Sequence, residues 1–281
     1  MLIFFPTQIQ IEPTSEDFFA QAISYKLGTE GTTQNSTKAF ELFTQAVAMG
    51  NLDAMVELGK AYEEGMGVKK DEAKALSLYQ QAMEKGSALA ESCVANCFAE
   101  GKGGAPRDEK RAMEIWCRLS DGGLADAQFH LGVMHYMGRQ VKANDFTAAQ
   151  LFEKATTKGH ADAMSALAGM YYTGKGVVKN EEKAAALWRQ AGEAGNPEGY
   201  FHLGRMCERA NNLPHSTAMY KLAAQRGLAH AQFKLALAYE KGKGIDADLQ
   251  QAARWYALAA EHEATKALAQ EGLKRVQATK T

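Results

Sequence analysis

The chain repeats itself with a period of about 36 residues along most of its length. Residues 53–68, DAMVELGKAYEEGMGV, are echoed by residues 162–177, DAMSALAGMYYTGKGV. A small residue opens the repeats that start near residues 54, 90, 127, 163, 199 and 231, and one period before the first of these a further repeat starts near residue 18. A chain of this kind folds as stacked copies of one supersecondary element, because no single copy can bury its apolar face alone.

Each repeat carries the signals of two helices. The first has small, leucine and aromatic residues at helical spacing, as in Ala54, Leu58 and Tyr62. Glycines such as Gly65 and Gly67 then end it, since glycine adopts the positive φ of a helix C-cap. The second helix is predicted to start at an Asp or Asn that caps its N-terminus, in turn Asn35, Asp71, Asp108, Asn144, Asn180, Asn212 and Asp248.

The second helices carry the predicted core. Alanines recur on both sides of one large residue, and this large residue is Phe43, Tyr79, Trp116, Phe152, Trp188 or Tyr256. Small residues let neighbouring helices approach closely, and the large rings fill the gaps between layers. The sequence therefore predicts an all-α fold, a right-handed α-solenoid of about seven stacked antiparallel helix pairs.

Three segments follow from this periodicity. Residues 1–16 are predicted to form an N-terminal arm, residues 17–263 the solenoid, and residues 264–281 a C-terminal capping helix. In the capping helix Leu268, Leu273 and Val276 are expected to face inward, while the basic residues near its end meet water.

The pattern Ala-x-x-x-Leu-Gly-x-x-Tyr-x-x-Gly-x-Gly-Val, which starts at Ala54, resembles the Sel1-like repeat family, relatives of the tetratricopeptide repeat. The resemblance extends from Phe18 to Glu263. It weakens in the repeat that starts at Gly199, where Cys207 takes the aromatic position and the turn is shorter. The resemblance implies a solenoid that binds proteins, and solenoids of this kind are usually not enzymes.

Composition excludes several partners as defaults. The chain has 32 Lys and Arg against 33 Asp and Glu, so its formal charge of -1 supplies no general field for nucleic acid or anionic lipid. The apolar start, Met1–Pro6, lacks a basic region and the length of a signal or membrane segment, which indicates a cytoplasmic protein without membrane insertion. The four cysteines are expected to be thiols.

Candidate catalytic and metal-binding groups are few. The Gly101–Gly104 turn follows a helix rather than a strand, so it is interpreted as a structural turn and not a phosphate-binding loop. Cys93, Cys97 and Cys117 give three thiols, whereas a closed zinc site takes four ligands. His130 and His135 diverge on one helix and are not expected to share a metal. No metal and no cofactor are predicted.

The resemblance also bears on catalysis. A secreted, cysteine-rich branch of Sel1-like proteins is associated with β-lactam binding or hydrolysis and carries a disulfide pair in each repeat. This chain has alanines, Ala82, Ala155 and Ala191, near the places where such cysteines would recur. A β-lactam-binding hydrolase is therefore the least favoured of the functions considered.

The candidate binding surface is the concave face, which the first helices line in the related tetratricopeptide repeats. Its aromatic and basic residues in the last two-thirds of the chain are Phe129, Tyr136, Tyr172, Phe201, Arg205, Arg209 and Phe233. Aromatic and arginine side chains provide most of the binding energy in protein interfaces. Two interpretations stay open, because these rings either form a peptide groove or fill space between neighbouring helices.

Three functions are consistent with these features. The first is a non-enzymatic adaptor or scaffold that binds a partner protein or peptide on the concave face. The second is an immunity protein that neutralises a cognate toxin, as some bacterial Sel1-like proteins do, and the third is an enzyme. The sequence leaves the partner and the oligomeric state open.

Overall fold

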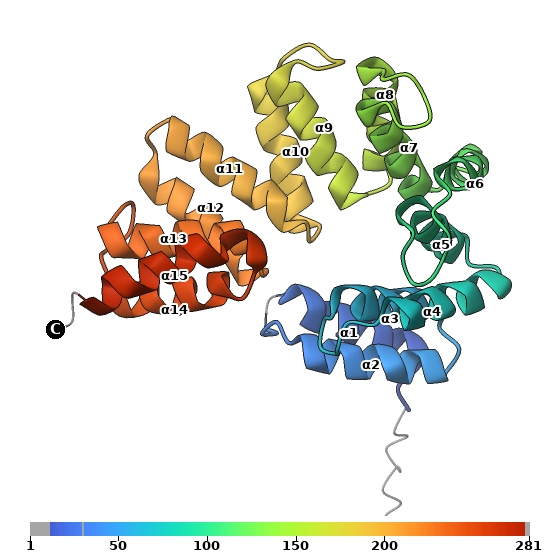
Figure 1. Cartoon of the computed structure of the whole chain (residues 1–281), viewed down its shortest axis with the longest axis horizontal. Coiled ribbons are helices and arrows are strands. Elements are labelled where there is room, and N and C mark those ends of the chain that lie inside the picture. The colour runs from blue at the N-terminus through green and yellow to red at the C-terminus, as the bar shows by residue number, and fades with distance from the viewer. Residues whose placement is uncertain (1–11, 30, 279–281) are drawn as a thin grey trace, which may run out of the picture. The chain divides into compact units, whose positions relative to one another are not determined.

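The computed structural model describes residues 12–29 and 31–278, and every regular element in these ranges is an α-helix (Figure 1). The helices are α1 Ser15–Leu27, α2 Ser36–Ala48, α3 Leu52–Glu64, α4 Glu72–Glu84, α5 Ala88–Glu100, α6 Glu109–Asp121, α7 Ala125–Met137, α8 Asp145–Thr156, α9 Ala161–Thr173, α10 Glu181–Glu193, α11 Pro197–Arg209, α12 Leu213–Gln225, α13 Ala229–Lys241, α14 Leu249–Ala260 and α15 Glu263–Ala278. The predicted all-α fold of stacked helix pairs is confirmed.

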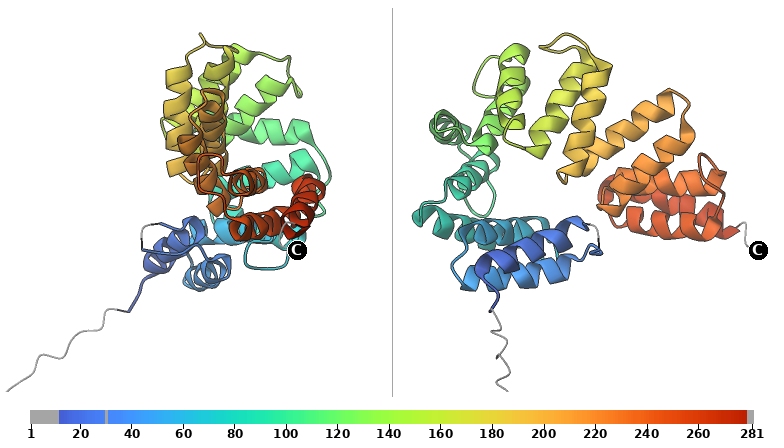
Figure 2. Two further views of the ribbon diagram at one scale, coloured as in Figure 1. Left: turned by 90° about the vertical axis from the view of Figure 1, so that its left-hand side faces the viewer. Right: turned by 180° about the vertical axis from the view of Figure 1, so that it is seen from behind.

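The helices form two compact units, Met1–Ile115 and Trp116–Thr281. In the N-terminal unit, helices α1 to α5 pack in chain order, each against the next. In the C-terminal unit, helices α7 to α15 do the same, and Figure 2 shows successive pairs of that unit side by side from two directions. Packing mainly between chain neighbours is the contact pattern of a repeat stack.

The predicted core residues are buried. The alanines that open the repeats at positions 54, 90, 127, 163 and 231 have no exposed surface. The six predicted large residues of the second helices are at most 3% exposed, and Tyr220 takes the same place in the repeat with the shorter turn. Burying one such ring removes an area of apolar surface worth roughly 2–3 kcal/mol, so these rings are the main stabilising contacts of each repeat.

The predicted caps are present in all seven repeats. Each Asp or Asn side chain accepts a hydrogen bond from a backbone N–H two or three residues further along. The backbone N–H of each cap residue also donates to a carbonyl of the preceding first helix, as from Asp71 to Tyr62 at 2.8 Å. Each turn is therefore fixed at both ends by hydrogen bonds.

The glycine pair in the turns has two roles. The first glycine, as in Gly65 or Gly174, is the left-handed C-cap of the first helix. At the second glycine, an added Cβ would lie 2.2–2.5 Å from a backbone oxygen of the preceding repeat; these glycines are Gly67, Gly103, Gly176 and Gly244. In each case that oxygen belongs to the first residue of a second helix. The turn of one repeat thus packs directly on the repeat before it.

The two ends of the repeat array differ in detail from the sequence prediction. Most of the predicted arm lies outside the described residues, and α1 begins at Ser15, where Thr14 and Asp17 form a capping box. At the other end α15 packs against α14 and α13. Val276 is buried there, but the expected inward position of Leu268 is wrong, since its side chain is 55% exposed.

The inward face of α15 is set by the ring beneath it. Thr265, Ala269 and Gly272 are buried, and a Cβ on Gly272 would lie 2.5 Å from the Tyr256 ring. Only a helix that turns its smallest residues inward fits against this ring. Leu268, one residue before Ala269, is consequently turned away from α14.

We predict that Gly176→Ala destabilises the chain far more than Gly159→Ala. Both glycines have positive φ, so either alanine costs about 1–2 kcal/mol of backbone strain. At Gly159 a Cβ meets nothing within 4 Å, whereas at Gly176 it lies 2.2 Å from the Asp145 carbonyl oxygen. We expect roughly 2 kcal/mol or more of additional loss for Gly176→Ala. Urea unfolding followed by circular dichroism measures the difference, and equal losses would contradict the close packing of the turn.

Candidate partner-binding site

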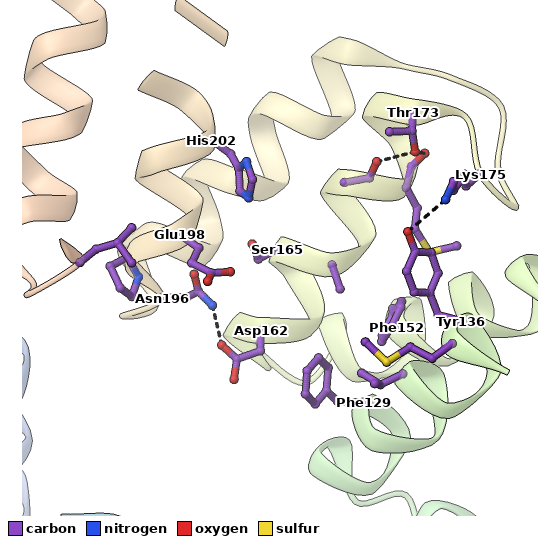
Figure 3. A pocket seen from close by; sticks show the side chains of 17 residues that line it. Phe129, Tyr136, Phe152, Asp162, Ser165, Thr173, Lys175, Asn196, Glu198 and His202 are labelled. Atoms are coloured by element: carbon purple, nitrogen blue, oxygen red, sulfur yellow. Dashed lines mark hydrogen bonds between the residues drawn. The ribbon is translucent and has the colours of Figure 1, made fainter. Parts of the chain in front are cut away.

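The first helices of three repeats in the C-terminal unit enclose an open groove of about 650 Å³ (Figure 3). It lies over α9, with α7 along one side and the start of α11 along the other. We call it the α9 groove. Phe129 and Val133 of α7, Phe152 of α8 and Met170 of α9 contribute its apolar surface. Side chains of four helices thus converge on one hollow.

The groove is hollow because α9 has small residues where α7 has large ones. Phe129 and Val133 of α7 correspond in the repeat to Ser165 and Gly169 of α9. A Cβ built on Gly169 meets nothing within 4 Å. Glycine inside a helix costs about 1 kcal/mol relative to alanine, so Gly169 weakens α9 and gains no packing contact in return.

The neighbouring glycine position has the opposite role. A Cβ on Gly132 of α7 would lie 2.6 Å from the Phe152 ring, and Gly59 and Gly204 meet Tyr79 and Tyr220 in the same way. Glycine at this position lets the first helix approach the large ring of the second. Gly169 comes one place later in the repeat and has no such ring against it.

The charged groups of the groove lie at its two ends (Figure 3). At one end Asp162, Asn196 and Glu198 lie together, and the Asn196 side-chain amide donates to the Asp162 carboxylate. At the other end the Lys175 ammonium donates to the Tyr136 hydroxyl at 3.4 Å and lies 5.3 Å from its ring centre. One end therefore carries two carboxylates and the other a lysine that is already engaged.

His202 of α11 lines the groove and stacks on Trp188, with ring centres 5.0 Å apart. Burial, together with the positive charge of Arg205, lowers the pKa of His202 below its usual value. The same stack recurs two repeats earlier, where the ring centre of His130 lies 4.4 Å from that of Trp116. Histidine on tryptophan is thus a packing element of this unit.

The structure separates the predicted binding residues into groups. Phe129 and Tyr136 line the α9 groove. Tyr172 packs on Trp188. The Arg209 guanidinium donates a hydrogen bond to the Tyr172 hydroxyl, and its central carbon lies 5.7 Å from the centre of the Tyr172 ring. Arg205 is exposed. The seven residues therefore do not line one groove.

The remaining two rings pack within their own repeats. Phe201 lies 5.6 Å from Tyr220, and Phe233 lies 5.7 Å from Tyr256. Phe129 makes the same contact with Phe152, at 5.8 Å. All three rings are half-buried, so each contacts a core ring with part of its surface and leaves part uncovered.

Sequence reasoning missed the residues that make the groove, namely Ser165, Gly169, Asp162, Asn196 and Glu198. A signal was available at one of them. Gly169 is the only glycine at its place in the repeat, where the other first helices have Lys60, Asn96, Val133, Arg205 and Leu237. A search for aromatic residues finds Phe129 and Tyr136 at the edge of the groove but not the small residues of α9 that leave it open.

A second regularity also escaped sequence reasoning. Where the second helix carries Tyr79, Tyr220 or Tyr256, the first helix of the same repeat carries Glu63, Glu208 or Glu240, and each tyrosine hydroxyl donates to that carboxylate. A cation further along the chain binds the same glutamate, as Lys102 binds Glu63 at 3.0 Å. Hydrogen bonds from Arg275 and Tyr256 lower the pKa of Glu240.

The other groups singled out in the sequence also lie in the described residues. None of the four cysteines forms a disulfide, and burial raises the pKa of Cys97 to about 11, which disfavours the reactive thiolate. Lys102 of the Gly101–Gly104 turn pairs with Glu63 and Glu100. In the ranges 12–29 and 31–278 no three His, Cys, Asp or Glu side chains are grouped as metal ligands, and no helix is long and apolar enough to cross a membrane.

The stacked helix pairs place this chain in the class of helical-repeat solenoids. The Sel1 repeat model matches residues 22–51, 52–87, 88–124, 125–160, 161–196 and 229–263, and the chain belongs to this family. The unmatched residues 197–228 include the repeat with the shorter turn. That repeat still folds as the pair α11 and α12, because Asn211 adopts positive φ and Asn212 caps α12.

Similar proteins come from bacteria and from mouse. A Sel1 repeat protein from Oxalobacter formigenes is 26% identical, with a TM-score of 0.63 over 93% of this chain and 76% of that one. A protective antigen of uropathogenic Escherichia coli is 30% identical, with a TM-score of 0.55 over 93% of this chain and 56% of that one. Protein sel-1 homolog 2 of Mus musculus is 29% identical over 53% of this chain, which spans about a fifth of the mouse protein.

We predict opposite effects of alanine at two helical glycines. Gly169→Ala is expected to raise the free energy of unfolding by up to about 1 kcal/mol, because alanine favours the helix and its methyl group has room. Gly132→Ala is expected to lower it by about 1–3 kcal/mol, because its methyl group meets the Phe152 ring. Urea unfolding compares the two variants, and a destabilised Gly169→Ala would show that the groove is closed.

We also predict that acidification destabilises the chain partly through His202. Its pKa is lower in the folded chain than the usual 6.5, so the unfolded chain takes up the proton first as the pH falls. The His202 contribution to the free energy of unfolding therefore falls as the pH drops below about 6.5. The variant His202→Phe keeps a ring against Trp188 and removes the titration. Unfolding curves between about pH 7.5 and pH 5 should show a smaller loss of stability for the variant, and equal losses would contradict the assignment.

Proposed function

We propose that the chain is a non-enzymatic adaptor that binds a partner protein or peptide on the surface formed by the first helices of its C-terminal unit. The α9 groove carries this proposal, because it is an open, largely apolar hollow on that surface. Half-buried aromatic rings border it or continue beyond it on α7, α9, α11 and α13. Such rings supply large contact areas at low cost in conformational entropy.

The family supports this function in general terms. Sel1 repeat proteins typically mediate protein–protein interactions, and the chain carries the repeat along most of its length. A stack of repeats presents equivalent positions of successive helices on one continuous surface, which suits an extended partner. The identity of the partner then decides between a scaffold and an inhibitor of a toxic enzyme.

We predict that changes on the first helices abolish partner capture. The surface variant carries Tyr136→Ser, Arg205→Glu and Arg209→Glu, all at exposed positions on α7 and α11. A matched control carries Phe146→Ser, Arg189→Glu and Lys221→Glu, also exposed, on the second helices α8, α10 and α12. The measurement is affinity capture from a lysate of the source cells, quantified by mass spectrometry, after circular dichroism has shown that both variants are folded.

Wild type and control are expected to capture the same partner, and the surface variant at least about tenfold less of it. If the surface variant keeps the partner and the control loses it, binding belongs to the second helices. If no protein is enriched over an unrelated bait, the interaction function itself is contradicted.

A further inference from the structure

We infer that the α9 groove binds an extended peptide segment in which a large apolar side chain stands next to a lysine or arginine. This inference rests on the proposed function of the first-helix surface and adds the chemistry of its partner. Three observations support it: the shape of the groove, the charges at its ends, and the hydrogen bonds that several of its polar side chains already make within the chain.

The apolar side chain is indicated by the floor of the groove. Phe129, Val133, Phe152 and Met170 surround the space that Gly169 leaves open. Glycine at this place weakens α9 and no residue of the described chain fills the space, so its effect on the structure is to make room. A side chain as large as leucine, methionine or phenylalanine fits the chemistry of these walls and is removed from water there.

The cation is indicated by the acidic end. Asp162 and Glu198 are both exposed and line the groove. Asp162 accepts a hydrogen bond from the neutral Asn196, and Glu198 makes neither a hydrogen bond nor an ion pair with any residue in the described ranges. Neither carboxylate is neutralised by a basic residue, so this end attracts a positive charge.

The nearby basic residues do not cancel this charge. Lys175 is bonded to Tyr136 at the opposite end of α9, as Figure 3 shows. Arg209 is bonded to Tyr172, and neither Arg209 nor Arg205 lines the groove. A segment with an apolar anchor and a neighbouring Lys or Arg therefore complements both the floor and the acidic end.

A peptide fits better than a small polar molecule. A small polar ligand is oriented by a few convergent polar groups that bond to it directly. Here the Thr173 hydroxyl donates to the Gly169 carbonyl at 2.8 Å, the Asn196 amide is bonded to Asp162 and to the Gly199 N–H, and Lys175 holds Tyr136. Apart from the side chains of Ser165 and His202, what remains is an apolar hollow beside negative charge, which suits an anchor and a cation better than a polar scaffold.

The first test selects peptides without assuming a partner. A phage library of random peptides of about twelve residues is panned on the full-length chain and counter-selected on Gly169→Met, which fills the groove. Asn96→Met, the same place in the repeat that starts near residue 90, is the matched control. Peptides that bind wild type and Asn96→Met but not Gly169→Met are expected to share a large apolar residue next to Lys or Arg.

The second test measures the charge directly. One selected peptide is synthesised with a fluorophore, together with a version in which its basic residue is replaced by glutamine. Fluorescence polarisation is expected to show that Asp162→Asn with Glu198→Gln weakens the basic peptide about three- to tenfold and leaves the glutamine version unchanged. The basic peptide alone should lose affinity at high salt.

The outcomes separate this inference from the proposed function. If the Gly169-dependent peptides carry acidic residues, or no charge preference, the inferred chemistry is wrong. If peptides are selected but bind Gly169→Met equally well and are lost on the surface variant of α7 and α11, the interaction surface stands and the α9 groove is not its site. If no peptide is enriched, both proposals fail for peptide partners.

Discussion

The fold depends on the contact between a small residue of a first helix and a large ring of a second helix. Gly59 lies against Tyr79, Gly132 against Phe152 and Gly204 against Tyr220, each so closely that a methyl group would clash. These contacts set the distance between the paired helices, while the second glycine of a turn, as in Gly67 and Gly176, sets the distance to the preceding repeat. Where both distances are fixed, close packing leaves little freedom for the first-helix surface.

The parts of the fold that the sequence predicts are those that every repeat must share. The buried alanines, the large rings and the seven Asp or Asn caps recur with the period of the chain. A contact predicted in one repeat is therefore also predicted in the others. Even the repeat near residue 199 folds as predicted, since Asn211 replaces a glycine in the left-handed region that asparagine tolerates. Periodicity is informative wherever the same contact is made many times.

The groove could not be predicted in the same way, because it is a departure from the period. Gly169 differs from every residue at its place in the repeat, and a departure of this kind resembles neutral variation until the neighbouring side chains are known. The exposed Leu268 has the same origin, since its orientation depends on the Tyr256 ring beneath α15 rather than on its own hydrophobicity. Contacts made once are visible only in three dimensions.

A repeat stack also explains how a binding site can form without weakening the core. The large rings that hold the pairs together project from the second helices onto small residues of the first helices, and Phe152 is only 2% exposed although it contributes to the groove. Glycine at position 169 costs only about 1 kcal/mol of local helix stability relative to alanine, because a Cβ at that position would contact no other residue. Other repeats carry different residues at the same place, from Lys60 to Leu237, so this first-helix position varies between repeats while the place before it keeps a glycine or an alanine.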